Sequence, residues 1–89
     1  MIGARATITK VTMTTANTDY TVSIPAGAIR FEIKERDGGS LIRLYTTSGG
    51  DYITIPYGAS YAENDIKGPL TFIVQCPDAG KTLEVKYFK

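Results

Sequence analysis

The sequence contains no histidine, no tryptophan and only one cysteine among its 89 residues. Without histidine, the chain has no side chain that ordinarily gains and loses a proton near neutral pH, and it cannot build a histidine metal site. A single cysteine can form neither an internal disulfide nor a multi-cysteine metal site. We therefore expect no enzymatic activity, no catalytic residues, no metal and no cofactor.

The sequence also lacks a strong charge of either sign. Ten Lys and Arg residues stand against nine Asp and Glu residues, which gives a net charge of +1. Positive and negative side chains alternate along residues 30–37, as on a solvated strand, whereas nucleic-acid binders carry a basic stripe. No stretch approaches the roughly 18 apolar residues of a membrane span, and residues 1–5 do not resemble a secretory signal. We expect neither a nucleic-acid partner nor a membrane partner.

The residues that are abundant favour β-strands. Threonine, isoleucine and valine together supply 26 β-branched residues, and 6 Tyr and 3 Phe add to them. No segment has helical periodicity over three turns. A chain this short has room for one hydrophobic core, so we expect residues 1–89 to form a single β domain.

Short stretches of alternating apolar and polar residues, separated by turn residues, predict about seven strands. They cover residues 5–15, 20–24, 29–34, 41–47, 52–55, 70–74 and 83–87. In the first stretch Ile8 is out of phase with Val11 and Met13, which predicts a bulge or a break. Residues 57–67 follow no pattern and predict a long loop with at most one helical turn. The predicted fold is all-β, a small antiparallel β-sandwich or barrel of about seven short strands.

Several turns are predicted from their residue types, and two of them carry specific expectations. Asp37–Ser40, with two central glycines, is typical of a hairpin, so residues 41–47 should pair with residues 29–34, whose Ile29, Phe31 and Ile33 share one face. In residues 41–47 the predicted core face carries the two aliphatic residues at positions 42 and 44. Residues 77–80 predict a type I turn that ends in a left-handed glycine.

The candidate binding residues are four tyrosines and an arginine around the predicted loop. Tyr45, Tyr52, Tyr57 and Tyr61 fall within a short stretch, and Arg43 precedes them. Tyrosine is enriched at protein interfaces, so we predict a partner-binding surface. Stacking on sugars and simple coverage of the sheet stay open as alternatives.

Two further groups suggest sites but have simpler explanations. The carboxylates of Glu63 and Asp65 flank Asn64, yet their spacing matches no EF-hand loop and is typical of a solvated turn. Cys76 ends an apolar stretch and has no histidine to activate it, so we expect a small buried apolar side chain.

The order of strands, prolines and glycines along most of the chain resembles small virion proteins of tailed bacteriophages. The segments that carry this resemblance are Val11-Thr-Met-Thr-Thr-Ala-Asn-Thr-Asp-Tyr-Thr-Val-Ser-Ile-Pro-Ala-Gly, Phe31-Glu-Ile-Lys-Glu-Arg-Asp-Gly, Leu41-Ile-Arg-Leu, Tyr52-Ile-Thr-Ile-Pro-Tyr-Gly-Ala-Ser-Tyr, Leu70-Thr-Phe-Ile-Val and Ala79-Gly-Lys-Thr-Leu-Glu-Val. They consist of structural residues and include no catalytic motif.

The resemblance implies a non-enzymatic structural protein of the virion, assembled in the host cytoplasm. Its expected role is a capsid decoration or cement protein on the outer shell of the head, with the major capsid protein or other virion proteins as partners. It also implies a homo-oligomer such as a trimer, which would cover exposed sheet edges. A neck or tail component remains an alternative, as does a carbohydrate-binding module for attachment to the host surface.

Overall fold

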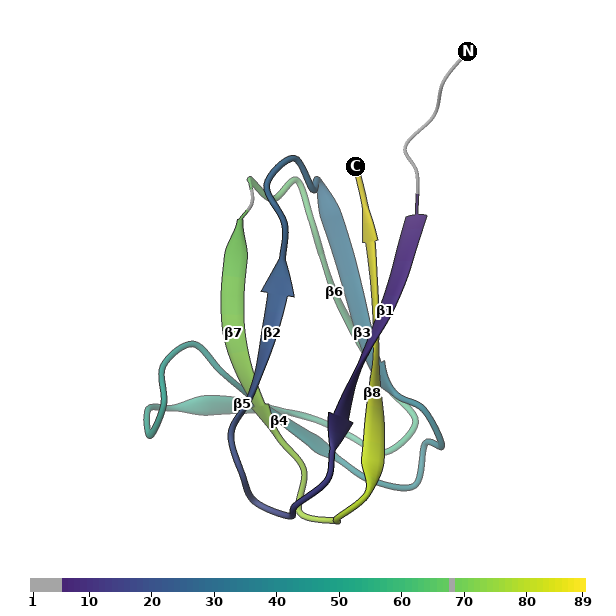
Figure 1. Ribbon diagram of the computed structural model, residues 1–89, viewed down its shortest axis with the longest axis vertical. Coiled ribbons are helices and arrows are strands. Elements are labelled where there is room, and N and C mark those ends of the chain that lie inside the picture. Colours follow the sequence, from purple (N-terminus) through teal and green to yellow (C-terminus); the bar gives the residue numbers. More distant parts are fainter. Residues whose placement is uncertain (1–5, 68) are drawn as a thin grey trace.

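The computed structural model describes residues 6–67 and 69–89, and these residues fold into two packed antiparallel sheets (Figure 1). One sheet has the strand order β1-β8-β3-β6 and the other β2-β7-β4-β5. The strands are β1 (Ala6–Met13), β2 (Tyr20–Ile24), β3 (Arg30–Glu35), β4 (Ile42–Tyr45), β5 (Tyr52–Ile55), β6 (Ser60–Asn64), β7 (Leu70–Gln75) and β8 (Lys81–Phe88). The predicted all-β sandwich is confirmed.

The chain is wound as one long antiparallel hairpin. The first strand pairs with the last, β2 with β7, β3 with β6, and β4 with β5. Two further pairings, β3 with β8 and β4 with β7, join these pairs into sheets. This order is that of a jelly roll, an eight-stranded architecture in which successive strands mostly alternate between the two sheets.

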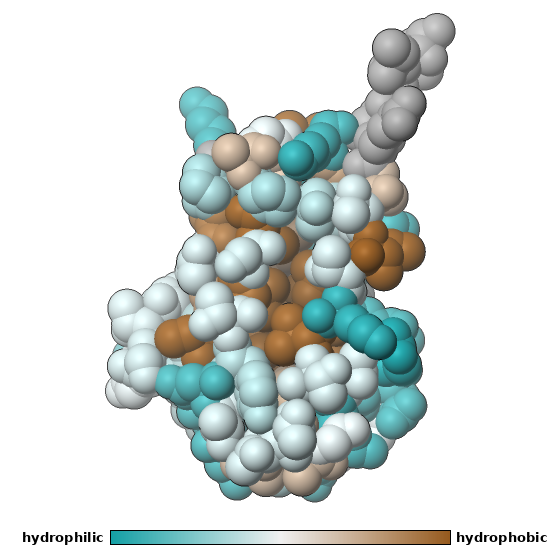
Figure 2. All heavy atoms as spheres, in the orientation of Figure 1, coloured by the Kyte–Doolittle hydropathy of each residue, from teal (hydrophilic) through white to brown (hydrophobic). Residues whose placement is uncertain are grey.

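The core consists of the apolar residues that both sheets turn inward. Val22 and Ile24 of β2 and Leu83 and Val85 of β8 are almost completely buried, as their alternation predicts. Phe31 of β3 reaches across the sandwich, and its ring centroid lies 5.3 Å from that of Phe72 on β7. A space-filling view shows apolar residues between the sheets, framed by hydrophilic ones (Figure 2).

Several predicted details are confirmed. Ile42 is fully buried and Leu44 is half-buried against the core. Cys76 is a buried free thiol. In the turn before β8, Gly80 has a φ of +75°, a left-handed conformation that glycine adopts without strain, and its N–H donates to the carbonyl of Met13 (2.9 Å).

The strand count is corrected from about seven to eight. The additional strand, β6, lies inside residues 57–67, for which the sequence predicts a loop. It pairs with β3 along its whole length, but only Tyr61 is half-buried and its other residues are exposed. An edge strand held mainly by backbone hydrogen bonds does not need alternating apolar residues, so the pattern that reveals strands was absent.

The bulge or break predicted near Ile8 is also wrong within the described residues. β1 pairs with β8 in continuous register from Ala6 to Met13, and Ile8 points away from the core with 73% of its surface exposed. Ile29 is likewise half-exposed at 50%, because β3 begins one residue after it. Arg5, the predicted first residue of this strand, lies outside the described residues, as do all of residues 1–5, which by sequence do not resemble a secretory signal.

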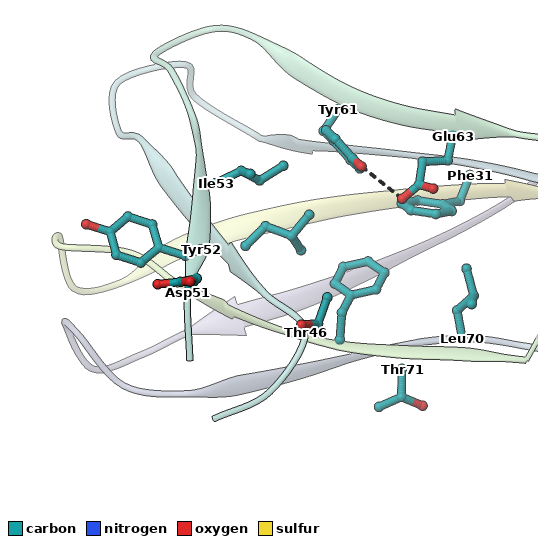
Figure 3. A pocket seen from close by; sticks show the side chains of 11 residues that line it. Phe31, Thr46, Asp51, Tyr52, Ile53, Tyr61, Glu63, Leu70 and Thr71 are labelled. Carbon is teal, nitrogen blue, oxygen red and sulfur yellow. Dashed lines mark hydrogen bonds between the residues drawn. The ribbon is translucent and has the colours of Figure 1, made fainter. Parts of the chain in front are cut away.

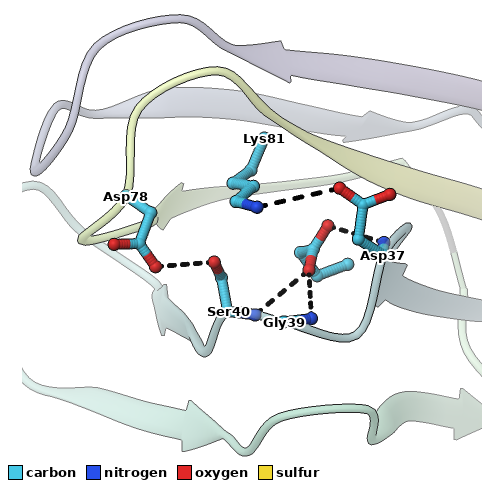
Figure 4. A network of polar contacts seen from close by, with 6 residues as sticks. Asp37, Gly39, Ser40, Asp78 and Lys81 are labelled. Carbon is cyan, nitrogen blue, oxygen red and sulfur yellow. Dashed lines mark hydrogen bonds and ion pairs between the residues drawn. The ribbon is translucent and has the colours of Figure 1, made fainter.

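The predicted hairpin at Asp37–Ser40 is wrong, because the chain crosses there from one sheet to the other. β3 pairs with β6 and β8, whereas β4 pairs with β5 and β7. The crossing is organised by the carboxylate of Glu35, which is 2% exposed and accepts hydrogen bonds from the backbone N–H groups of Asp37 (2.8 Å), Gly39 (3.1 Å) and Ser40 (3.2 Å) (Figure 4). These bonds fold the segment back over the end of β3.

Other polar contacts connect the same crossing segment to the turn before β8 and to the first residue of β8. The Ser40 hydroxyl donates to a carboxylate oxygen of Asp78 (2.6 Å), and Lys81 lies 3.7 Å from the carboxylate of Asp37.

Within the described ranges, no helix is long and apolar enough to cross a membrane.

We predict that Glu35→Ala lowers the free energy of unfolding by about 2–4 kcal/mol, because three backbone N–H groups lose their acceptor. Glu32→Ala is the matched control on the same strand, and it should change stability by less than about 0.5 kcal/mol. Urea denaturation followed by circular dichroism measures both. Equal stabilities of the two variants would show that the crossing does not depend on the Glu35 carboxylate.

Candidate functional site

A cavity lies where β5 and β6 separate. A four-residue turn, Pro56–Ala59, joins the two strands and is closed by a hydrogen bond from the Ala59 N–H to the Pro56 carbonyl (3.1 Å). The strand before this turn, β5, lies at the edge of one sheet, and the strand after it, β6, lies at the edge of the other. The space between them is a pocket of about 380 Å³ (Figure 3), within the range of roughly 300–1,000 Å³ that is usual for ligand sites.

The pocket has an apolar interior and a polar rim. Its interior combines residues from both sheets: Phe31, Leu44, Ile53, Leu70 and Phe72. Polar groups come from Thr46, Asp51, Tyr61, Glu63 and Thr71. Two of the lining residues are acidic and none is basic. The pocket can therefore hold an apolar group while its carboxylates attract a positive charge.

Tyr61 and Glu63 are fixed to each other at the β6 side of the pocket. They occupy alternate positions of the strand, so both point toward the space between the sheets. The Tyr61 hydroxyl donates a hydrogen bond to Oε2 of Glu63 (2.9 Å), as Figure 3 shows. Burial raises the pKa of Tyr61, and the hydrogen bond and negative charge of Glu63 raise it further. The phenol is therefore held in its neutral, donating form.

The predicted binding residues divide into three groups. Tyr45 and Tyr52 are directly opposite each other on β4 and β5, with ring centroids 5.1 Å apart, and the Arg43 guanidinium lies 5.9 Å from the Tyr52 ring centroid. This group lies on the outer face, so the Tyr52 ring points away from the pocket (Figure 3). Tyr61 lies on the inner face of the other sheet, and Tyr57 is in the turn between β5 and β6 with 67% of its surface exposed.

Two of these residues also have contacts inside the molecule that the sequence did not indicate. Tyr45 is buried at 8% exposure. Arg43 donates from Nη1 to the side-chain oxygen of Asn17 (3.0 Å) and so connects β4 to the loop before β2. Tyr52, by contrast, is 51% exposed and Tyr57 is more exposed still, so these two tyrosines offer the largest accessible aromatic surface of the predicted set.

Of the residues that line the pocket, the sequence indicated Tyr52 and Tyr61 as candidate binding residues, but not the others. Ile53 and Phe72 were recognisable only as strand residues, and Asp51 only as part of a turn. Glu63, for which the sequence predicts a solvated turn, lies in β6, and its carboxylate accepts a hydrogen bond from Tyr61. Over residues 6–67 and 69–89, no three His, Cys, Asp or Glu side chains are grouped so that they could hold a metal ion.

A smaller cavity of about 170 Å³ lies on the outer face of the sheet that contains β1. Ile8 borders it together with two acidic and two basic residues from neighbouring strands. Because cross-strand neighbours of opposite charge, such as Lys34 and Glu84, balance one another there, this hollow has no preference for a charged ligand.

Comparison with models of protein families and with curated protein sequences finds no match. Among solved structures, the fold is similar to that described as "Solution NMR structure of a de novo designed double-stranded beta-helix", with a TM-score of 0.55 and 20% identity. The match covers 96% of this chain and 99% of the designed chain. It agrees with the winding of the strand pairs described above and concerns the fold alone. The resemblance to phage virion proteins stays a prediction.

We predict that the pKa of Tyr61 lies above the ordinary value of about 10 and that Glu63→Gln lowers it part of the way back, because burial remains after the charge is removed. The folded state favours the protonated phenol, so its contribution to stability is complete below pH of about 10 and is lost as the pH rises further. The ¹³Cζ shifts of the tyrosines, followed against pH, measure the titration, and Tyr61→Phe assigns the signal. An unchanged midpoint in Glu63→Gln would contradict the role of Glu63.

Proposed function

We propose that this protein is a non-enzymatic structural component of a bacteriophage particle, a decoration protein bound to the outer shell of the head. The resemblance of most of the sequence to small virion proteins of tailed phages supports this proposal. The jelly-roll fold is compatible with it, because viral capsid proteins and lectins both use this architecture.

The observation that carries the proposal is the exposed apolar surface along and beside β5. Tyr52, Ile53 and Tyr57 expose 51%, 48% and 67% of their surfaces. β5 is also the last strand of its sheet, so one of its sides faces no neighbouring strand among the described residues. Exposed apolar side chains on an open strand edge mark a surface that gains stability when another chain covers it.

A decoration protein can use such a surface although each contact is weak. Many copies on one particle bind repeated sites, and copies that form a ring hold several sites at once. In this proposal the partners are the major capsid protein or other virion proteins, the protein acts as a homo-oligomer such as a trimer, and it resides in the virion.

The proposal predicts that the polypeptide is present in purified particles. Quantitative mass spectrometry should find roughly hundreds of copies per particle for a shell protein, and about a dozen or fewer for a neck or tail component. Absence from the particles would overturn the proposal. A low copy number would show that the protein belongs to the neck or tail and not to the shell.

The β5 surface can be tested in the same particles. Ile53→Ser combined with Tyr57→Ser should reduce the number of copies retained, whereas Ile8→Ser, which alters an exposed isoleucine on β1, should not. Circular dichroism establishes that each variant is folded. Equal retention of both variants would show that the shell binds another surface.

Carbohydrate binding is the second candidate, because Tyr52 and Tyr57 present accessible rings and lectins also use jelly rolls. Calorimetric titration of glycans selected on an array tests it. Binding that is lost in Tyr52→Ala and Tyr57→Ala would favour a host-attachment module, whereas no glycan binding by the parent protein would eliminate this function.

A further inference from the structure

The pocket between β5 and β6 combines two properties that suit one kind of side chain. Its interior is formed by aromatic and aliphatic residues from both sheets, including Phe31, Phe72 and Ile53. Its polar lining includes the carboxylates of Asp51 and Glu63, which belong to exposed residues. Arginine and lysine have a long apolar stem and a positively charged head, and they commonly bury the first while the second stays near water.

The carboxylate of Glu63 is already oriented for such a head group. Its Oε2 accepts a hydrogen bond from Tyr61, which holds the side chain on the inner face of β6 (Figure 3). No side chain or backbone group of the described residues donates to the second oxygen, Oε1, so it can accept a further bond. A guanidinium carries five N–H donors and an ammonium three, so either can reach this oxygen. Charge-assisted bonds of this kind are stronger than neutral ones.

The open edge of β5 provides the second half of the site. In an antiparallel sheet, alternate residues of an edge strand direct their N–H and C=O groups outward. Ile53 points into the pocket, and its neighbours Tyr52 and Thr54 point to the outer face. A segment added alongside β5 would therefore direct every second side chain into the space between β5 and β6.

We propose that the pocket receives an arginine or lysine side chain carried by an extended segment of a partner protein, which pairs with the free edge of β5. Backbone hydrogen bonds supply affinity and the acidic, apolar pocket supplies selectivity, as in other cases of strand addition. The identification of the partner as a virion protein rests on the proposed function. The chemistry of the recognised segment rests on the pocket and on the edge of β5, independently of that function.

The probe is an end-capped peptide, Thr-Thr-Val-Arg-Val-Thr-Thr, compared with the same peptide carrying norleucine or glutamate at the central position. ¹⁵N–¹H spectra recorded during titration should show shifts at Ile53, Tyr61 and Glu63. The arginine peptide should bind about tenfold more tightly than the glutamate peptide, with norleucine between them, because both carboxylates attract one head group and repel the other. Equal affinities of the three peptides would overturn the selectivity of the pocket.

Two variants separate the pocket from the rest of the surface. Glu63→Gln should reduce the preference for arginine over glutamate by about three- to tenfold. The matched control is Glu32→Gln, on the neighbouring strand of the same sheet but on its outer face, and it should leave the preference unchanged. A preference that survives Glu63→Gln, or falls equally in both variants, would contradict the assignment.

Further probes distinguish strand addition from other occupants. A peptide N-methylated at the residues flanking arginine should bind at least about tenfold more weakly, because it loses the backbone hydrogen bonds. If n-butylguanidinium binds as tightly as the peptide, the site holds a small cation instead. If the protein alone shows the same β5 shifts as its concentration rises, with dimers in sedimentation, the occupant is a second copy. Either result would overturn the proposal that the site is occupied by a segment of a partner protein.

The outcome is independent of the test of the proposed function. Selective peptide binding by a protein that is absent from particles would retain this site and reject the virion role. Conversely, a protein present in particles that does not bind the peptides would retain the virion role and reject this site.

Discussion

The structure depends on one constraint, which is that each sheet must bury an apolar face although its strands are not consecutive in the chain. Among the strands of residues 6–67 and 69–89, only β4 and β5 form a local hairpin, and every other pair joins segments that are distant in sequence. The first and last strands, β1 and β8, are direct neighbours. The sandwich becomes stable only when these distant segments meet, since no sheet is complete before then.

The alternation between sheets also determines where polar groups must be buried. The chain leaves the end of β3, crosses the sandwich and begins β4, and the backbone of this crossing needs hydrogen-bond partners. Glu35 continues the inward face of Phe31 and Ile33, so its carboxylate reaches the crossing from the core side. A position that looks like a polar interruption of an apolar face is thus required by the connection that follows it.

The same alternation produces the pocket. β5 and β6 follow each other through a short turn but belong to different sheets, so they must separate. Both are edge strands, and no further strand of the described residues fills the space between them. Phe31 and Phe72 at this space are buried core residues of their strands, whereas Ile53 is half-exposed. The pocket therefore arises from the position of these residues beside two open edges rather than from any special residue type.

The sequence by itself determined the all-β class, most strands, the inward faces of β2, β3, β7 and β8, and the glycine turn before β8, because alternation and turn chemistry are local properties. It indicated exposed tyrosines, but it could not separate Tyr52 and Tyr57, which are accessible, from Tyr45, which is buried. Only the tertiary structure decided that β3 and β4 lie in different sheets, that residues 60–64 form a strand, and that Glu63 faces Phe72 and Ile53 across a pocket. These features depend on which distant strands become neighbours, and that choice is made by the packing of the whole core.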